Sequence, residues 1–239
     1  MRINKIFKNS IAMLVLFFAF GGFAQNQNTI TLPLDAFYAK IKSVKSPQII
    51  DARSPEEFAL NHIEGSVNFN LQTENYAKYV AQLDNSKPVF LYAINTGRST
   101  ALAKELLKNG SSDVHDLEGG IAAWIGGGKP FYTNLKSKLS LAEYQKIIAD
   151  NNAVLVDIGS RYCGACKKVK PVLETIRAQY GTNLKIIEID LEESPQVIAD
   201  LKTVNVFPTL ILYQNGKIIF KKDGLGDLKN DIDLALAQK

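Results

Sequence analysis

The sequence predicts an α/β protein of two domains, and three observations lead to that fold class. From residue 30 to residue 239, short apolar runs alternate with stretches whose apolar residues recur at helical spacing. A glycine-rich segment, residues 126–130, interrupts this alternation, and a second series of apolar runs begins beyond it. The chain has 239 residues, 46% of them hydrophobic and 22% charged, which is typical of globular proteins and allows two domains.

The first 24 residues have the order of a secretory signal peptide. Arg2, Lys5 and Lys8 form a basic start, residues 11–20 are an unbroken apolar run, and small residues stand at positions 22 and 24. A bilayer span needs about 20 apolar residues, whereas the run from residue 11 to Ala24 has 14, and polar residues follow it at once. We therefore expect residues 1–24 to be removed. The mature protein would then lie in the periplasm or the medium, without a stable membrane anchor.

The charge argues against nucleic acid as a partner. The 28 basic and 24 acidic side chains give +4 at pH 7, but three of the positive charges lie in the signal segment. The remainder has 25 basic and 24 acidic side chains, a net charge of +1, and shows no basic stripe of the kind that binds phosphates. Since the chain has only two cysteines, it is not a multi-disulfide scaffold either.

In the first half of the chain, two strands and one helix are the clearest elements. Residues 48–51 and 89–92 are short apolar runs typical of buried strands. Residues 100–108 have a helical pattern, which Asn109-Gly110 closes.

The second half contains a longer series of elements. Residues 153–158 are continuously apolar, as in a parallel strand covered on both faces. The helix expected over residues 167–180 has one apolar face and ends at Gly181, a favourable C-terminal cap. Asn215-Gly216 predicts a tight hairpin turn. The other expected elements are helices over residues 141–149 and 225–237 and strands over residues 186–189, 209–213 and 217–220.

Two cysteines three positions apart carry the candidate chemistry. The motif Cys163-Gly164-Ala165-Cys166 lies between a strand and the helix that follows it. A thiol at a helix N-terminus faces free backbone N–H groups and the positive end of the helix dipole, and both favour the thiolate. We expect Cys163 to face the solvent and to attack a substrate disulfide. Cys166, one turn further and more buried, would resolve the mixed disulfide.

Two other uses of the cysteine pair remain open. A structural disulfide closing four residues would remove only about 2 kcal/mol of chain entropy from the unfolded state. A structural zinc site needs four ligands, and the other plausible ligands, His62 and His115, lie in the first domain. We therefore favour a redox role and expect no metal.

Two further features accompany the dithiol. Asp157 interrupts an apolar strand six residues before Cys163, and burial of an unpaired carboxylate raises its pKa. Asp157 is therefore a candidate to exchange a proton with Cys166, the alternative being a carboxylate that caps a loop. Phe207-Pro208 directly precedes the strand over residues 209–213. A proline with a cis peptide bond at this position would form a tight turn placed where it could serve function.

These features resemble the thioredoxin family over residues 133–239. The matching residues are Asp157, Cys163, Cys166, Pro171, Pro208, Asn215, Gly216 and Gly224. The resemblance implies a thioredoxin-like fold with a mixed central sheet. It also implies a cis peptide at Phe207–Pro208 that faces the cysteines and offers backbone groups to an extended substrate, so that Phe207 and Pro208 are expected to bind substrate.

The sequence departs from the thioredoxin pattern at three positions. Tyr162 precedes the first cysteine where the family has tryptophan, and Ala165 replaces the proline inside the motif. Ile186 stands where many members have a lysine facing the buried aspartate. Glu188 is the nearby group that could couple to Asp157 instead.

Residues 28–132 resemble the rhodanese family. The resemblance is carried by Ile50-Asp51-Ala52-Arg53, by Asn61-His62-Ile63-Glu64-Gly65 and by Leu117-Glu118-Gly119-Gly120. In that family a strand ends in a cysteine that opens an anion-binding loop. The corresponding loop here is Tyr92-Ala93-Ile94-Asn95-Thr96-Gly97-Arg98-Ser99, which agrees in length and in Gly97, Arg98 and Ser99. Asp51 and Arg53 are expected to fix the loop by hydrogen bonds.

The catalytic position of this loop is Ala93. A methyl group cannot hold a persulfide, so sulfur transfer through the loop is excluded on chemical grounds. Ile94 makes the rim apolar, and Arg98 is the remaining cation. We expect a binding or docking surface here, the alternatives being a structural relic or residual binding of small anions.

Taken together, the residues predict an α/β protein with a signal peptide over residues 1–24, an inactive rhodanese-like domain over 28–132 and a thioredoxin-like domain over 133–239. The expected activity is thiol-disulfide exchange with protein clients and a redox partner, without a cofactor because the electrons stay on sulfur. One alternative is a redox-sensing scaffold without turnover. The other is persulfide handling by Cys163 with an outside sulfur donor.

Overall fold

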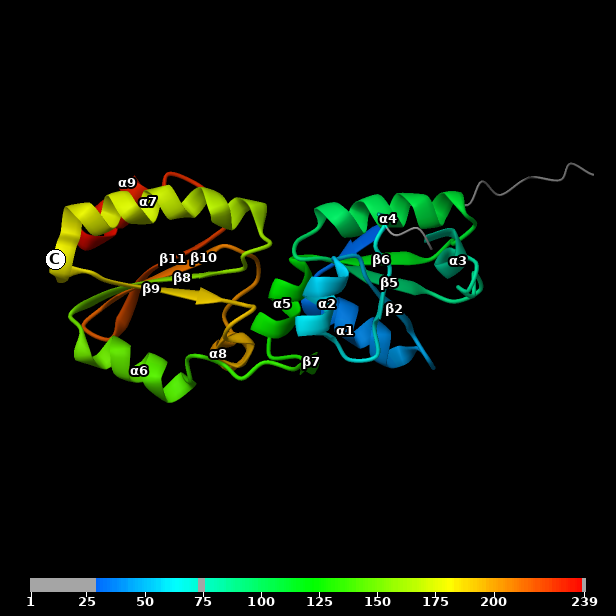
Figure 1. Cartoon of the computed structure of the whole chain (residues 1–239), viewed down its shortest axis with the longest axis horizontal. Coiled ribbons are helices and arrows are strands. Elements are labelled where there is room, and N and C mark those ends of the chain that lie inside the picture. The colour runs from blue at the N-terminus through cyan, green and yellow to red at the C-terminus, as the bar shows by residue number, and fades with distance from the viewer. Residues whose placement is uncertain (1–28, 73–75, 238–239) are drawn as a thin grey trace, which may run out of the picture.

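The structure is a computed structural model that describes residues 29–72 and 76–237. The expected signal peptide lies outside the described residues. Within them, no helix has both the length and the apolar character needed to cross a membrane. Figure 1 shows two lobes side by side, the first half of the chain in one and the second half in the other.

The first lobe is built on a five-stranded parallel sheet. The strands have the order β1-β6-β5-β2-β4, and every neighbouring pair is parallel. They are β1 (Ile30–Leu32), β2 (Gln48–Asp51), β4 (Val67–Asn68), β5 (Val89–Tyr92) and β6 (Val114–Leu117). Since side chains alternate along a strand, Phe90 and Tyr92 belong to one core layer, and Val89 and Leu91 to the other.

Helices cover both faces of this sheet. α4 (Gly97–Lys108) lies on one face, and α1 (Leu34–Ser43) on the other (Figure 1). The remaining helices of the lobe are α2 (Pro55–Leu60), α3 (Tyr76–Val80) and α5 (Gly120–Gly126). A separate antiparallel ribbon joins β3 (Asn61–Ile63) to β7 (Phe131–Thr133), so the chain returns to the first lobe after the glycine-rich segment.

The second lobe has a four-stranded sheet in the order β11-β10-β8-β9. The strands are β8 (Ala153–Gly159), β9 (Lys185–Asp190), β10 (Thr209–Gln214) and β11 (Lys217–Asp223). β8 and β9 are parallel, whereas β10 is antiparallel to both of its neighbours. This confirms the expected mixed central sheet.

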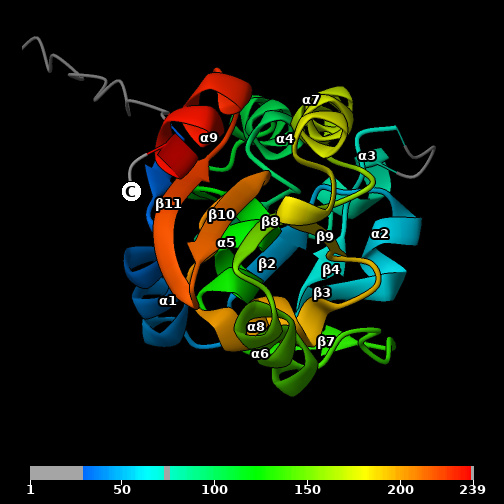
Figure 2. The ribbon, with the colours of Figure 1, turned by 90° about the vertical axis from the view of Figure 1, so that its left-hand side faces the viewer.

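The helices of the second lobe form a layer on each side of its sheet (Figures 1 and 2). α7 (Gly164–Tyr180) and α9 (Leu228–Ala237) lie on one side, and α6 (Leu141–Asp150) and α8 (Pro195–Leu201) on the other. A short 3-10 turn, Gly181–Asn183, follows α7. Gly181 is the C-cap of α7 with φ of +53°, as its position in the sequence predicted.

The boundaries differ from the predicted ones mainly at helix starts. α4 begins at Gly97 rather than at residue 100, and α7 begins at Gly164 rather than at residue 167. The last helix begins at Leu228, three residues later than predicted. α8, the helix that faces the first lobe, was not predicted, because Pro195–Leu201 is too short to show a periodic pattern.

The two lobes share one buried hydrophobic cluster. α5 packs against α8, and Trp124 and Ile125 of the first lobe share the cluster with Val197 and Ile198 of the second. A Cβ atom added at Gly126 would lie 2.2 Å from the carbonyl oxygen of Val204. Gly126, the first residue of the glycine-rich segment, therefore lies in a close packing contact between the two domains.

Candidate functional site

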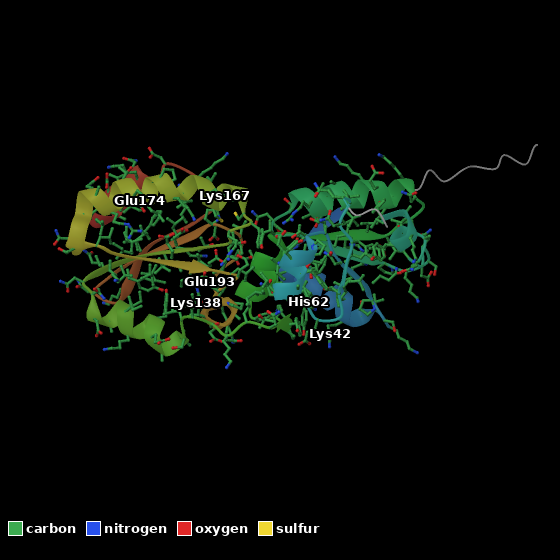
Figure 3. All side chains as sticks on the ribbon, in the orientation of Figure 1. Lys42, His62, Lys138, Lys167, Glu174 and Glu193 are labelled. Carbon is green, nitrogen blue, oxygen red and sulfur yellow. The ribbon has the colours of Figure 1, made fainter. Side chains whose placement is uncertain are left out.

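The two cysteines lie at the start of α7, where β8 has just ended. Cys163 is the N-cap residue, and its sulfur accepts a hydrogen bond from the backbone N–H of Cys166 at 3.2 Å. Both thiols are free. Lys167, the residue after Cys166, marks the end of α7 that faces the first lobe (Figure 3). The dithiol thus lies at the junction of the two domains.

The two thiols have opposite pKa shifts. A hydrogen bond from the Cys166 side chain lowers the pKa of Cys163, burial opposes this, and backbone N–H groups of Cys166 and Ala165 lower it further. The same hydrogen bond, together with burial, raises the pKa of Cys166. Cys163 is therefore the sulfur that ionises first, as a nucleophile must.

The expectation that Cys163 faces the solvent is wrong. Its exposed fraction is 0%, against 7% for Cys166. The reason is the loop that follows β5: Ile94 lies in the same buried cluster as Cys163, and Asn95 donates from Nδ2 to the Phe207 carbonyl at 3.3 Å. The Cys163 thiol lies 3.8 Å from the same carbonyl oxygen. The first domain therefore covers the candidate nucleophile.

Asp157 lies in the middle of the second sheet, next to the dithiol. It is 8% exposed, and its Oδ1 has no hydrogen-bond partner among the described residues. Burial raises the pKa of Asp157 to about 7; the charges of Glu188 and Cys163 add to the effect, and Lys170 opposes it. Glu188 is its register partner on β9, which agrees with the coupling expected from the sequence.

A cavity of about 110 Å³ connects Asp157 with Cys166. Its lining includes both side chains together with Gly159 and Lys170. A Cβ atom added at Gly159 would lie 3.0 Å from the Cys166 sulfur, so glycine leaves room for the close approach of this sulfur to β8. The cavity is large enough for a water molecule between the carboxylate and the thiol.

The peptide between Phe207 and Pro208 is cis, as the resemblance implied. Phe207 is 1% exposed, and its carbonyl is the common acceptor for Cys163 and Asn95. The predicted hairpin at Asn215-Gly216 is also present, with φ of +51° and +76°, between β10 and β11.

Sequence reasoning missed two residues of the site. Glu192 is 5% exposed and accepts hydrogen bonds from the Ser160 hydroxyl at 2.8 Å and from the Arg161 N–H at 3.2 Å, so it fixes the loop before Cys163. Burial raises the pKa of Glu192. In the sequence it is one of four acidic residues within positions 188–193, with no signal that it is buried. Asn95 was missed because its contact crosses 112 positions of the chain.

The loop of the first domain has lost its free cation as well as its nucleophile. Ala93 is fully buried, and its carbonyl accepts a hydrogen bond from the Ile121 N–H at 2.8 Å. Arg98 forms two hydrogen bonds with the Glu57 carboxylate, at 2.5 and 2.7 Å. Since that carboxylate neutralises the guanidinium, the loop has little left to attract an anion.

The scaffold under this loop is a buried ion pair, as expected. The Arg53 guanidinium bonds to both carboxylate oxygens of Asp51 and to the Asn61 side chain, and both charged side chains are fully buried.

The two histidines lie away from the cysteines. His62 bonds to the Phe58 carbonyl and stacks on rings, and His115 lies 2.6 Å from Asp113.

The fold and site define a two-domain α/β protein whose second domain carries a dithiol at a helix N-terminus. Residues 34–126 match the family model of the rhodanese-like domain, and residues 136–236 match that of thioredoxin. The chain belongs to the rhodanese-like family through its first domain, which is followed by a thioredoxin domain.

Two curated proteins and one solved structure illustrate what the chain is similar to. A thiosulfate sulfurtransferase GlpE of Shewanella oneidensis is 35% identical over 85 residues, 36% of this chain and 82% of that protein. A thioredoxin of Mycobacterium tuberculosis is 37% identical over 71 residues, 30% of this chain and 60% of that protein. The chain thus spans about 60% of the length of the curated thioredoxins it matches. A mutant thioredoxin from Halobacterium salinarum has 31% identity and a TM-score of 0.37, over 43% of this chain and 88% of its own.

Proposed function

We propose that the protein is an exported thiol-disulfide oxidoreductase that exchanges disulfides with protein clients. The observation that carries the proposal is the position of Cys163 as the N-cap of α7, with its sulfur accepting a backbone N–H and its pKa lowered. This arrangement supplies a thiolate near neutral pH, and a second thiol is one helical turn away.

The first step is attack of the Cys163 thiolate on one sulfur of a client disulfide. A bond forms between Cys163 and that sulfur, the client disulfide breaks, and the other client sulfur leaves as a thiolate. The backbone at Phe207 and Pro208 lies beside the attacking sulfur and would bind the client chain.

The second step regenerates a free client. The Cys166 thiol gives its proton to the Asp157 carboxylate, directly or through water in the cavity they share, and attacks the sulfur of Cys163. The mixed disulfide breaks, the client leaves with two reduced sulfurs, and the protein is left with a Cys163–Cys166 disulfide. A dithiol partner returns the enzyme to its reduced state, and no cofactor takes part.

The first domain would act as a docking module without sulfur-transfer activity. Ala93 provides no sulfur, and Arg98 is paired with Glu57. The signal-like residues 1–24 support export to the periplasm or the medium.

A second candidate is a redox-sensing scaffold that does not turn over, and the complete burial of Cys163 favours it. Trapping of mixed disulfides and measurement of disulfide turnover distinguish the oxidoreductase from the scaffold. With the full chain, Cys166→Ser should accumulate mixed disulfides with client proteins on a non-reducing gel, because the resolving thiol is gone. Cys163→Ser should trap nothing and should abolish disulfide turnover. Equal trapping by both variants contradicts the assigned roles, and trapping by neither favours the scaffold.

A further inference from the structure

Two residues of one short turn in the first domain share the buried surroundings of Cys163, and the side chain of one of them, Asn95, lowers the pKa of Cys163 by hydrogen bonding. We call Ile94-Asn95 the covering turn. Ile94 is 8% exposed and belongs to the buried cluster that contains Cys163 and Phe207. Asn95 reaches across the domain junction with its carboxamide, whose nitrogen donates to the Phe207 carbonyl.

The covering turn is held in place by close packing elsewhere on the junction. A Cβ atom at Gly126 would lie 2.2 Å from the Val204 carbonyl oxygen, and one at Gly119 would lie 2.1 Å from that of Asn205. Both contacts are to backbone, which cannot move as a side-chain end can. The domains therefore fit together only because these positions carry no side chain.

Attack on a disulfide requires access along the line of the bond to be broken, and a sulfur with no exposed surface cannot provide it. The turn must therefore leave Cys163 before exchange takes place. The group it releases is the Phe207 carbonyl, an acceptor that a backbone N–H of an extended chain can take in place of the Asn95 amide. A groove of about 560 Å³ beside the turn, lined by both domains, includes Thr96 and Val206, the sequence neighbours of Asn95 and Phe207.

We propose that the covering turn selects the substrates of Cys163: it excludes small disulfides and yields to a disulfide held in an extended polypeptide segment, whose backbone replaces Asn95 at the Phe207 carbonyl. This inference rests on the proposed exchange activity and specifies its substrate class. A compact disulfide without an amide N–H gains nothing at Phe207 and reacts only when the domains separate spontaneously.

The first test measures access to Cys163 without any disulfide chemistry. The reduced full chain is alkylated with iodoacetamide over a range of pH, and the label on Cys163 is followed by peptide mass spectrometry. The midpoint of the profile reports the pKa, whereas the plateau at high pH reports access, because the sulfur is then fully ionised.

Asn95→Ala should raise the plateau by about 2- to 10-fold, the contribution of one neutral hydrogen bond to the closed state. Gly126→Ala, which places a methyl group against the Val204 carbonyl, should raise it further. The matched controls are Asn205→Ala, whose amide bonds within its own domain to Asp223, and Gly97→Ala, whose new methyl group meets no atom within 4 Å. The alkylation plateaus of both control variants should stay within twofold of the plateau of the unmodified protein.

The second test measures selectivity. The rate of oxidation of the reduced protein is compared for 2-hydroxyethyl disulfide, which has no amide, and for a flexible peptide that contains one disulfide. Asn95→Ala should accelerate the small disulfide more than the peptide, so the ratio of the two rates should shift several-fold toward the small one.

An Asn95→Ala plateau at or below that of the unmodified protein would overturn the inference, whether or not Gly126→Ala folds. An unchanged ratio of the two oxidation rates would overturn the selection of extended clients. Since alkylation needs no exchange activity, a raised plateau together with failed client trapping would remove the proposed function and leave the covering of Cys163 in place.

Discussion

Replacement of Asp157 by asparagine should stabilise the protein at alkaline pH. The buried carboxylate has a pKa of about 7 in the folded protein, against 3.8 as its ordinary value. One pKa unit corresponds to 1.36 kcal/mol, so keeping this group ionised costs the folded state up to about 4 kcal/mol. Asparagine has nearly the same shape and cannot ionise.

The direction in which stability changes with pH follows from the number of protons bound by the folded and unfolded states. Between about pH 4 and pH 7, the folded protein keeps the Asp157 proton while the unfolded chain has lost it, so stability falls as the pH rises through this window. Below the window both states are protonated, and the cost is absent. The gain from Asp157→Asn should therefore be small near pH 4, grow through the window and level off above about pH 7.

The assay is urea denaturation of the reduced protein, followed by circular dichroism at several pH values. Asp150→Asn is a matched control, because that carboxylate is 56% exposed at the end of α6 and should change stability by less than about 0.5 kcal/mol. The same Asp157→Asn protein should also resolve mixed disulfides more slowly, since its proton acceptor is gone. A stability gain of equal size at pH 4.5 and pH 8, or no gain at either, would refute the reasoning.

Three other predictions concern the remaining parts of the chain. Sulfur transfer from thiosulfate to cyanide by the full chain should equal the buffer blank, because Ala93 has no sulfur; clear turnover would show that its chemistry has been misplaced. Mass spectrometry of exported protein should find an N-terminus at or near Gln25, and a mature chain that begins at Met1 would contradict the signal peptide. Arg53→Ala should cost about 3–5 kcal/mol of stability in thermal or urea unfolding, because it leaves the Asp51 carboxylate buried and unpaired; a change below about 1 kcal/mol would show that the ion pair is not needed.

The parts of the site that the sequence predicts correctly are local. The dithiol at a helix N-terminus, the hairpin at Asn215-Gly216 and the C-cap at Gly181 each depend on a few consecutive residues, whose backbone preferences decide the structure. The cis peptide at Phe207–Pro208 came only from the family resemblance.

The parts that the sequence does not predict depend on the docking of two domains. Cys163 was expected to be exposed because it stands at the start of a helix. Whether Asn95 meets Phe207 depends on how α5 packs against α8, and that packing depends on backbone contacts at Gly119 and Gly126. No pattern within either domain carries this information.

The covering of Cys163 and the stabilisation of its thiolate act on the same sulfur but come from different elements. The Cys166 and Ala165 N–H groups belong to the helix that carries Cys163, so they stay with the sulfur when the domains separate. The Asn95 amide, whose hydrogen bond also lowers the pKa of Cys163, leaves with the covering turn, and the burial that raises this pKa is lost at the same time. Opening therefore removes the Asn95 hydrogen bond, which stabilises the Cys163 thiolate, and the burial, which destabilises it. The N–H groups of the helix continue to favour the thiolate. It follows that client access, more than loss of the Cys163 proton, should limit the rate of exchange near neutral pH.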